Sequence, residues 1–239
     1  MKNNANDLYL INSYKEVGDQ TWKNNDFVES SLKISKGFFT EESLLLRMPK
    51  PKKLDVYALL SGVSFPLELT EKLSNIQKSI DIILGDCLHY WVAPLNFGME
   101  YCVFKWPEDS WDESWLPLIL KEIDLIDKSS FQLNIHGIQI NSDGCVLAKG
   151  YDETGMIFKV REHLKSNLEF LPKKQSGWAH IPMGRIMEPL GTSKFLELKN
   201  LINELDSLLI GSVKVNSVKL VHETRWYMEE RSTLSTFNF

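Results

Sequence analysis

The stretch Gly177-Trp178-Ala179-His180-Ile181-Pro182-Met183-Gly184-Arg185-Ile186 decides the fold of this chain. Successive side chains of a β-strand point to opposite faces of a sheet. The apolar face of this stretch carries Ala179, Ile181 and Met183. His180 stands on the other face, where its neighbours are only Pro182 and Gly184. A histidine beside such small or flat residues is not packed into a core, so the stretch predicts a buried strand with His180 facing a cleft.

Composition is that of a soluble globular protein, with 43% apolar and 25% charged residues among 239. This length suits one large domain or two small lobes. The net charge of −5 excludes a general nucleic-acid binder, because such proteins need a basic surface field. A few local cations can still hold a nucleotide or an RNA end. No apolar run is long enough to span a bilayer, so we expect no membrane partner. The oligomeric state has no signature in the sequence.

The cysteines indicate a reduced, cytoplasmic setting. Cys87, Cys102 and Cys145 are widely spaced and form no CxxC motif, and no signal peptide is recognisable. Cys87 would share a strand face with His89, which raises the alternative of a thiol nucleophile. A buried structural cysteine is the preferred interpretation.

Two regions differ in their patterning. Residues 1–50 are polar with scattered aromatic side chains, and we interpret them as an extension that packs on the body or on a partner. The run Pro49-Lys50-Pro51-Lys52-Lys53 marks the end of that extension, because X-Pro units favour extended chain. Residues 51–239 then form the predicted domain.

Regular hydrophobic periods follow in the body. Strands are predicted over 54–63, 87–95, 100–106, 131–140, 145–151, 177–186, 213–222 and 233–239. Helices are predicted over 67–84, about 110–127, 154–170 and 193–209. The turn Asn141-Ser142-Asp143-Gly144 joins two of the strands into a hairpin. The mixture of helices with an antiparallel hairpin predicts an α+β fold rather than an all-parallel sheet.

His89 is the histidine that matches His180. Both lie on predicted strands, and His89 follows a strand–helix unit, whereas His136 and His163 show no comparable partner pattern. Two histidines facing each other across a cleft can act as an acid/base pair, because the ordinary histidine pKa near 6.5 allows both protonation states near neutral pH. Such a pair suits in-line attack at phosphorus. His222 begins the only literal His-x-Thr of the chain, but a structural role at a strand end is preferred for it.

Over residues 54–239 the chain resembles the 2H phosphoesterases, the superfamily of 2′-5′ RNA ligases and cyclic phosphodiesterases. His180-Ile181-Pro182-Met183-Gly184-Arg185-Ile186 looks like the second His-x-Thr motif of that family, and His89-Tyr90-Trp91 looks like the first. The order of predicted elements is also similar. The resemblance implies a two-lobed α+β fold in which antiparallel sheets form a central cleft and helices pack outside. It implies no metal and no cofactor.

The two motifs depart from the family at the same place. Family members hold the phosphate with a Thr or Ser hydroxyl two residues after each histidine, where this chain has Trp91 and Pro182. Neither side chain offers a hydroxyl, and Pro182 lacks an N–H. Two interpretations therefore stand. One is a phosphodiester hydrolase that acts on a cyclic nucleotide phosphate or RNA end through His89 and His180. The other is a catalytically degenerate cleft that binds a nucleotide or RNA end.

Four further residues are candidates for substrate binding. Trp91 can stack on a base, although a core tryptophan is the slightly favoured alternative. Arg185 occupies a place where the family often has an arginine, but simple alternation puts it on the face away from His180, and a surface salt bridge is an equal alternative. Arg225 and Tyr227, with Trp226 between them, are candidates for a rim that pairs with a phosphate or stacks on a base. An ordinary strand end explains that rim equally well.

Overall fold

A computed structural model describes residues 5–127 and 129–239. Within them the helices are α1 (Ala5–Thr21), α2 (Glu29–Lys36), α3 (Glu41–Leu45), α4 (Leu67–Leu84), η1 (Pro94–Asn96), α5 (Trp115–Leu125), α6 (Met156–Asn167) and α7 (Thr192–Leu205). The strands are β1 (Lys53–Gly62), β2 (His89–Trp91), β3 (Gly98–Lys105), β4 (Phe131–Ile140), β5 (Cys145–Tyr151), β6 (His180–Ile186), β7 (Leu209–Val215), β8 (Ser217–Arg225) and β9 (Glu230–Asn238).

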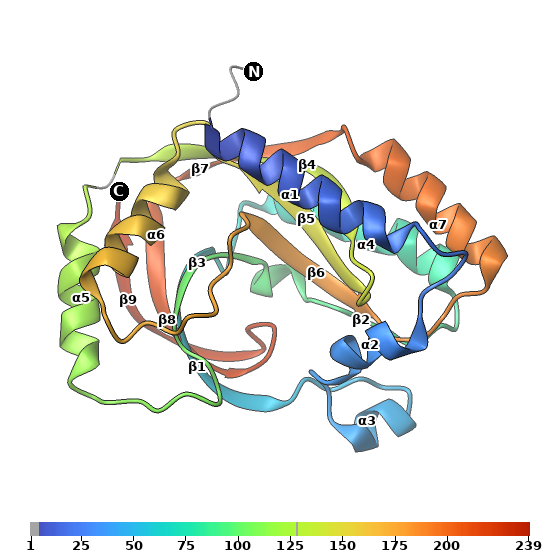
Figure 1. Cartoon of the computed structure of the whole chain (residues 1–239), viewed down its shortest axis with the longest axis horizontal. Coiled ribbons are helices and arrows are strands. Elements are labelled where there is room, and N and C mark those ends of the chain that lie inside the picture. Colours follow the sequence, from blue (N-terminus) through green and yellow to red (C-terminus); the bar gives the residue numbers. More distant parts are fainter. Residues whose placement is uncertain (1–4, 128) are drawn as a thin grey trace.

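The strands form two antiparallel sheets (Figure 1). One sheet has the order β3-β1-β8-β9 and the other has the order β2-β6-β5-β4-β7. The predicted α+β class with antiparallel sheets is therefore confirmed. The stretch around His180 forms β6, which lies between β2 and β5.

The chain crosses between the sheets at Asn216. The sequence pattern predicts one strand over 213–222, and that prediction is wrong. β7 ends at Val215 in the five-stranded sheet, and β8 begins at Ser217 in the four-stranded sheet. The apolar pattern runs on through the junction because both strands are half-buried, so periodicity alone cannot show the change of sheet.

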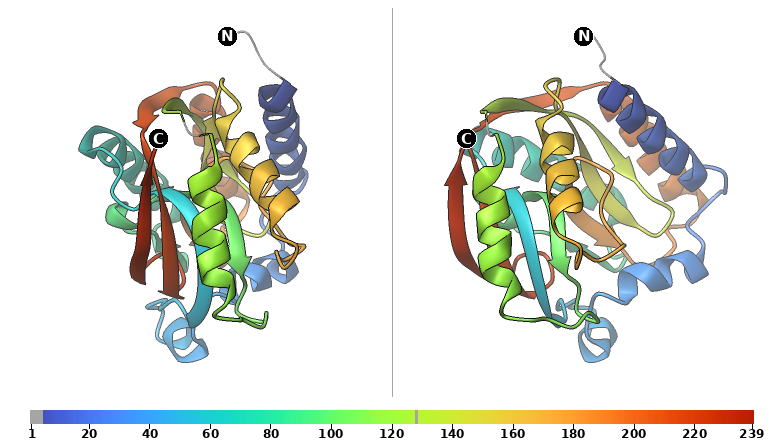
Figure 2. Two further views of the ribbon diagram at one scale, coloured as in Figure 1. Left: turned by 90° about the vertical axis from the view of Figure 1, so that its left-hand side faces the viewer. Right: turned by 60° about the vertical axis from the view of Figure 1, so that its left-hand side comes forward.

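Helices cover the five-stranded sheet from two sides. Figures 1 and 2 show α1 on one side of this sheet and α4 on the other. α4 lies against β7 and α7. Its buried side chains recur every three or four residues, as the sequence predicts for an amphipathic helix. They include Leu69, Leu73, Ile76, Ile80 and Ile83.

Residues 5–50 pack on the body, and much of this segment is helical rather than irregular. Leu10 and Tyr14 of α1 are almost fully buried in the core that β4, β5 and β6 share. The Tyr14 hydroxyl donates a hydrogen bond to the Ala179 carbonyl oxygen, 2.9 Å away. Thr21 Oγ1 donates to the Ile140 carbonyl oxygen at 2.8 Å. The boundary at residue 50 stays a prediction, but the segment shares a hydrophobic core with the sheet.

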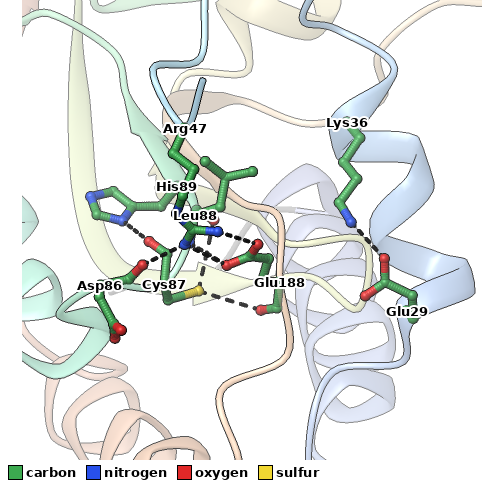
Figure 3. A network of polar contacts seen from close by, with 8 residues as sticks. All are labelled: Glu29, Lys36, Arg47, Asp86, Cys87, Leu88, His89 and Glu188. Carbon is green, nitrogen blue, oxygen red and sulfur yellow. Dashed lines mark hydrogen bonds and ion pairs between the residues drawn. The ribbon is translucent and has the colours of Figure 1, made fainter. Parts of the chain in front are cut away.

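A polar network ties the end of this segment to the body (Figure 3). The Arg47 guanidinium donates to both carboxylate oxygens of Glu188, at 2.8 and 2.9 Å, and to the Asp86 carbonyl oxygen at 2.6 Å. Glu188 also accepts the Leu88 N–H at 2.8 Å. Arg47 therefore joins the loop after β6 to the loop before β2.

None of the helices in the described residues combines the length and the apolar character that a membrane crossing requires.

Candidate functional site

A pocket of about 370 Å³ lies between the two sheets. β3, β1 and β8 contribute one side, and β6 contributes the other. Its aromatic lining consists of Phe38, Trp106, Trp226 and Tyr227. Its polar lining consists of Asn96, Glu100, Glu108, Lys174, His180, Arg185 and Glu223. A volume of this size lies in the lower part of the range for small-molecule sites, roughly 300–1,000 Å³.

His180 faces this pocket from β6, on the strand face that alternation predicts. Its Nδ1 is buried and has no hydrogen-bond partner within the described residues. Burial, and then the positive charges of Arg161 and Arg185, lower the pKa of His180 to about 4. The imidazole is therefore neutral at pH 7. It can accept a hydrogen bond from a ligand or donate one to it, but it has no positive charge with which to bind a phosphate.

Arg185 also faces the pocket, because β6 contains a bulge. Val146 pairs with Gly184 and Leu147 pairs with Pro182, so Met183 is the extra residue. An inserted residue reverses the alternation beyond it. Simple alternation put Arg185 on the far face, and the structure corrects this expectation. The Gln77 side-chain amide holds the bulge by donating to the Met183 and Val92 carbonyl oxygens, both at 2.9 Å.

The guanidinium of Arg185 is engaged by the protein. It donates to Asp143 at 2.8 Å, to the Tyr227 hydroxyl at 3.0 Å and to Ser35 Oγ at 3.3 Å. Its central carbon lies 4.5 Å from the centre of the Phe38 ring. Two of these neighbours, Ser35 and Phe38, come from the N-terminal segment. Arg185 therefore forms part of the pocket wall with its charge balanced by Asp143.

The structure places His89 outside this pocket, which corrects the expected pairing with His180. In β2, His89 lies opposite Ile186 and shares its core-facing side, while Tyr90 lies opposite Arg185. Both imidazole nitrogens of His89 are occupied, one by the Cys87 carbonyl oxygen at 2.7 Å (Figure 3) and the other by Asp81 of α4 at 2.7 Å. β2 is an edge strand beside β6 rather than a strand facing it.

Trp91 follows His89 to the same side and does not line the pocket. Its indole N–H donates to Asp81 at 3.0 Å. The ring lies against Gly184 so closely that a Cβ at residue 184 would come within 2.5 Å of it. The interpretation of Trp91 as a packed tryptophan is the one that fits this geometry.

Of the two residues predicted to form a rim, Arg225 and Tyr227, only Tyr227 lines the pocket. Tyr227 lines the pocket and binds Arg185. Arg225 does not line it, because its guanidinium donates to the Pro51 carbonyl oxygen at 2.7 Å and to Glu230 at 2.8 Å. Arg225 is only 7% exposed and is a structural residue of the sheet.

The strand that faces β6 across the pocket is β3, and it presents Gly98 and Glu100 there. Together with Glu223 of β8, Glu100 makes this side of the pocket acidic. Burial raises the pKa of Glu100 to about 7, against the lowering effect of Arg161. Burial also raises the pKa of Glu223 to about 8, against a hydrogen bond from the Met228 N–H and with repulsion from Glu100.

Sequence reasoning missed Glu100 and Glu223 because it searched for histidines. A usable signal was present in the chain. Gly98-Met99-Glu100 opens the strand that follows the β2 edge strand, and its two cleft-facing residues have the same spacing as His180 and Pro182. Within the described residues, no three His, Cys, Asp or Glu side chains gather as ligands for a metal ion.

Several solved structures have a fold similar to that of this chain. A phosphoesterase crystal structure superposes with a TM-score of 0.56 at 12% sequence identity, covering 78% of this chain and 99% of that one. TT0787 of Thermus thermophilus gives 0.54 at 15% identity, covering 77% and 97%. Escherichia coli LigT complexed with 3′-AMP gives 0.53 at 11% identity, covering 79% and 99%. The fold is that of the 2H phosphoesterases.

No family model and no curated protein sequence matches the chain. The 2H fold is therefore recognised through its three-dimensional arrangement. In this 2H fold the central cleft has one histidine among its described lining residues, His180 on β6. The facing positions on β3 hold Gly98 and Glu100, and the place two residues after His180 holds Pro182.

Proposed function

We propose that this protein is a nucleotide or RNA-end binding module of the 2H phosphoesterase fold, without two-histidine catalysis. The observation that carries this proposal is the composition of the two facing strands. β6 presents His180 and Pro182 to the cleft, and β3 presents Gly98 and Glu100. Neither strand offers a hydroxyl group there, and only one offers an imidazole.

The protonation states support binding rather than two-histidine catalysis. A general acid must carry a proton in the reacting complex. The pKa of His180 is lowered to about 4, chiefly by burial, so this imidazole is unprotonated at pH 7. His89 is held by Cys87 and Asp81 away from the cleft.

The lining supports a nucleotide as the ligand class. The cleft combines aromatic side chains, which stack on bases, with a small number of polar groups that fix orientation. Structures of similar fold include E. coli LigT complexed with 3′-AMP and with ATP. On the basis of these complexes we propose a nucleotide as the ligand of this chain as well.

The test is isothermal titration of the full chain with 3′-AMP, ATP and guanosine 3′-monophosphate, together with an assay for turnover of 2′,3′-cyclic nucleotides. We expect saturable binding without turnover. Trp226→Ala should weaken binding at least about fivefold, because stacking on one aromatic ring contributes about 1–3 kcal/mol. Leu46→Ala is the control, since Leu46 is exposed in the segment after α3. Absence of nucleotide binding would refute the proposal.

A second candidate function is hydrolysis with Glu100 in place of a second histidine. The observation that favours it is a carboxyl group of pKa about 7 that lines the same cleft as a neutral imidazole. Glu100 would protonate the leaving oxygen, and His180 would accept the proton of the attacking water. This candidate predicts cyclic phosphodiester turnover that both Glu100→Gln and His180→Ala abolish. His222→Ala is the matched control, because His222 lies on the other face of β8 and binds Asp55.

A further inference from the structure

Two carboxyl groups, those of Glu100 and Glu223, form an acidic floor of the cleft. Glu100 and Glu223 come from β3 and β8 of the same sheet and repel each other electrostatically. Glu223 already accepts the Met228 N–H at 2.8 Å. The carboxyl group of Glu100 forms no hydrogen bond to any described residue. Gly98, two residues before Glu100 on the same strand face, also lines the pocket and has no side chain to cover Glu100.

Neither of the buried arginines near this floor lines the pocket with a guanidinium free of protein hydrogen bonds: Arg185 lines the pocket and is held, and Arg161 is not one of its lining residues. Arg185 is held by Asp143, Tyr227 and Ser35. Arg161 donates from Nε and Nη2 to the backbone carbonyl oxygens of Tyr101, Glu100 and Trp178 at 2.7 to 3.0 Å, while its buried Nη1 has no partner among the described residues. A phosphate placed on this floor would meet two carboxyl groups, and no Ser or Thr hydroxyl is among the described lining residues. The floor therefore favours a ligand group that donates hydrogen bonds.

A free positive charge lies elsewhere in the pocket. Lys174 is exposed, and its ammonium nitrogen lies 4.9 Å from the centre of the Trp106 ring. Trp226 lies beside Trp106, with ring centres 6.4 Å apart, and Phe38 packs edge-on against Trp226 at 5.0 Å. The acidic floor, these aromatic rings and the exposed lysine all line one pocket, in which a flat ring can stack.

We infer that the cleft binds its nucleotide base-first, with a guanine ring against Trp106 and Trp226, its Watson–Crick edge on Glu100 and its phosphate outside near Lys174. This inference rests on the proposed function and specifies its ligand. Guanine presents two adjacent donors, N1–H and the N2 amino group, which match the two oxygens of one carboxylate. Adenine presents a donor beside an acceptor, so its edge meets a carboxylate less well. Burial raises the pKa of Glu100 to about 7, so the match requires the ionised carboxylate, which the two donors of guanine stabilise on binding.

Isothermal titration of the full chain with guanosine, adenosine, guanosine 3′-monophosphate, ribose 5-phosphate and inorganic phosphate tests the inference. We expect guanosine to bind within about tenfold of the Kd of the nucleotide, adenosine at least tenfold more weakly, and the two base-free phosphates not measurably. Glu100→Gln should weaken guanosine binding at least tenfold, because its amide replaces one acceptor by a donor. Glu204→Gln, on the exposed side of α7, is the matched control.

Two outcomes would overturn the inference. If ribose 5-phosphate and inorganic phosphate bind as tightly as the nucleotide while guanosine is silent, the base-first orientation is wrong and the proposed function survives. If no nucleotide and no nucleoside binds, both are wrong. Far-ultraviolet circular dichroism and a urea unfolding curve establish that Glu100→Gln is folded. Guanosine should quench the tryptophan fluorescence of the wild type. Loss of this quenching in the double variant Trp106→Phe/Trp226→Phe would show independently that the guanine ring lies against these two tryptophans.

Discussion

The Tyr227 hydroxyl accepts a hydrogen bond from Arg185 Nε at 3.0 Å and so links the β8–β9 turn to strand β6. Both groups are largely buried, and the other two acceptors of Arg185, Asp143 and Ser35, bind its Nη1 rather than its Nε. Tyr227→Phe leaves that N–H without a partner, and an unsatisfied buried donor costs about 1–3 kcal/mol. We expect the free energy of unfolding in urea to fall by this amount. Tyr9→Phe is the control, because Tyr9 is 48% exposed; an equal loss in both variants would contradict the role of the bond.

The bulge in β6 depends on Gln77. In Gln77→Leu the Val92 carbonyl oxygen loses its donor and the Met183 carbonyl oxygen keeps only the Val92 N–H. We expect destabilisation of about 1–3 kcal/mol, measured by urea unfolding, because buried carbonyl groups then lack partners. Gln132→Leu, at an exposed site on β4, should change stability by no more than about 0.5 kcal/mol. A Gln77→Leu variant as stable as the wild type would show that the bulge needs no such support.

Stability should fall as pH rises from 6.5 to 8. Between these values the folded protein retains protons on Glu100 and Glu223 (pKa about 7 and 8), whereas unfolded glutamates are already ionised. The folded state therefore binds more protons, and raising the pH favours unfolding. His180 acts in the opposite sense at lower pH, because its pKa of about 4 makes the folded state lose stability from pH 6.5 downward.

Glu223→Gln isolates the acidic contribution. Its amide oxygen can still accept the Met228 N–H, but the side chain no longer titrates. Urea unfolding at pH 6.5, 7.2 and 8.0 should show a shallower decline in the variant than in the wild type. Identical slopes would mean that Glu223 is ionised in the folded protein throughout this range.

Arg47 combines an ion pair with a left-handed backbone, at φ 55°. Arg47→Ala loses the contact with Glu188 and keeps the unfavourable Cβ, while Arg47→Gly loses the same contact and relieves the backbone. We expect the melting temperature of the Ala variant to lie about 2–4 °C below that of the Gly variant. The reverse order in a thermal scan would show that Arg47 is not held in this conformation.

The periodic segments of the fold are predictable, and the pairing of the histidines is not. α4 and the β4–β5 hairpin have the bounds that the apolar pattern gives. The cleft face of β6 is correct as far as Pro182. Beyond it, a single inserted residue reverses the alternation, and a bulge leaves no mark in apolar periodicity. Arg185 is therefore assigned to the wrong face.

The place of His89 could not be read from its residue type. A histidine on a short strand beside β6 and one on a strand facing β6 have the same local pattern. The distinction is set by the order of strands, which depends on contacts far apart in sequence. His89 is fixed by Asp81, a surface residue of α4 whose reach to β2 follows only from helix packing.

Phe38 lines the cleft and Ser35 contacts Arg185, and both belong to a segment that precedes the first strand. The compared structures are covered almost completely while about a fifth of this chain remains unmatched. A shortened protein that lacked residues 5–50 would lose Phe38 from the pocket lining and Ser35 as one acceptor of Arg185. The pocket of such a fragment would differ from that of the full chain, and its ligand specificity would differ with it. Screens for ligands should therefore use the full chain.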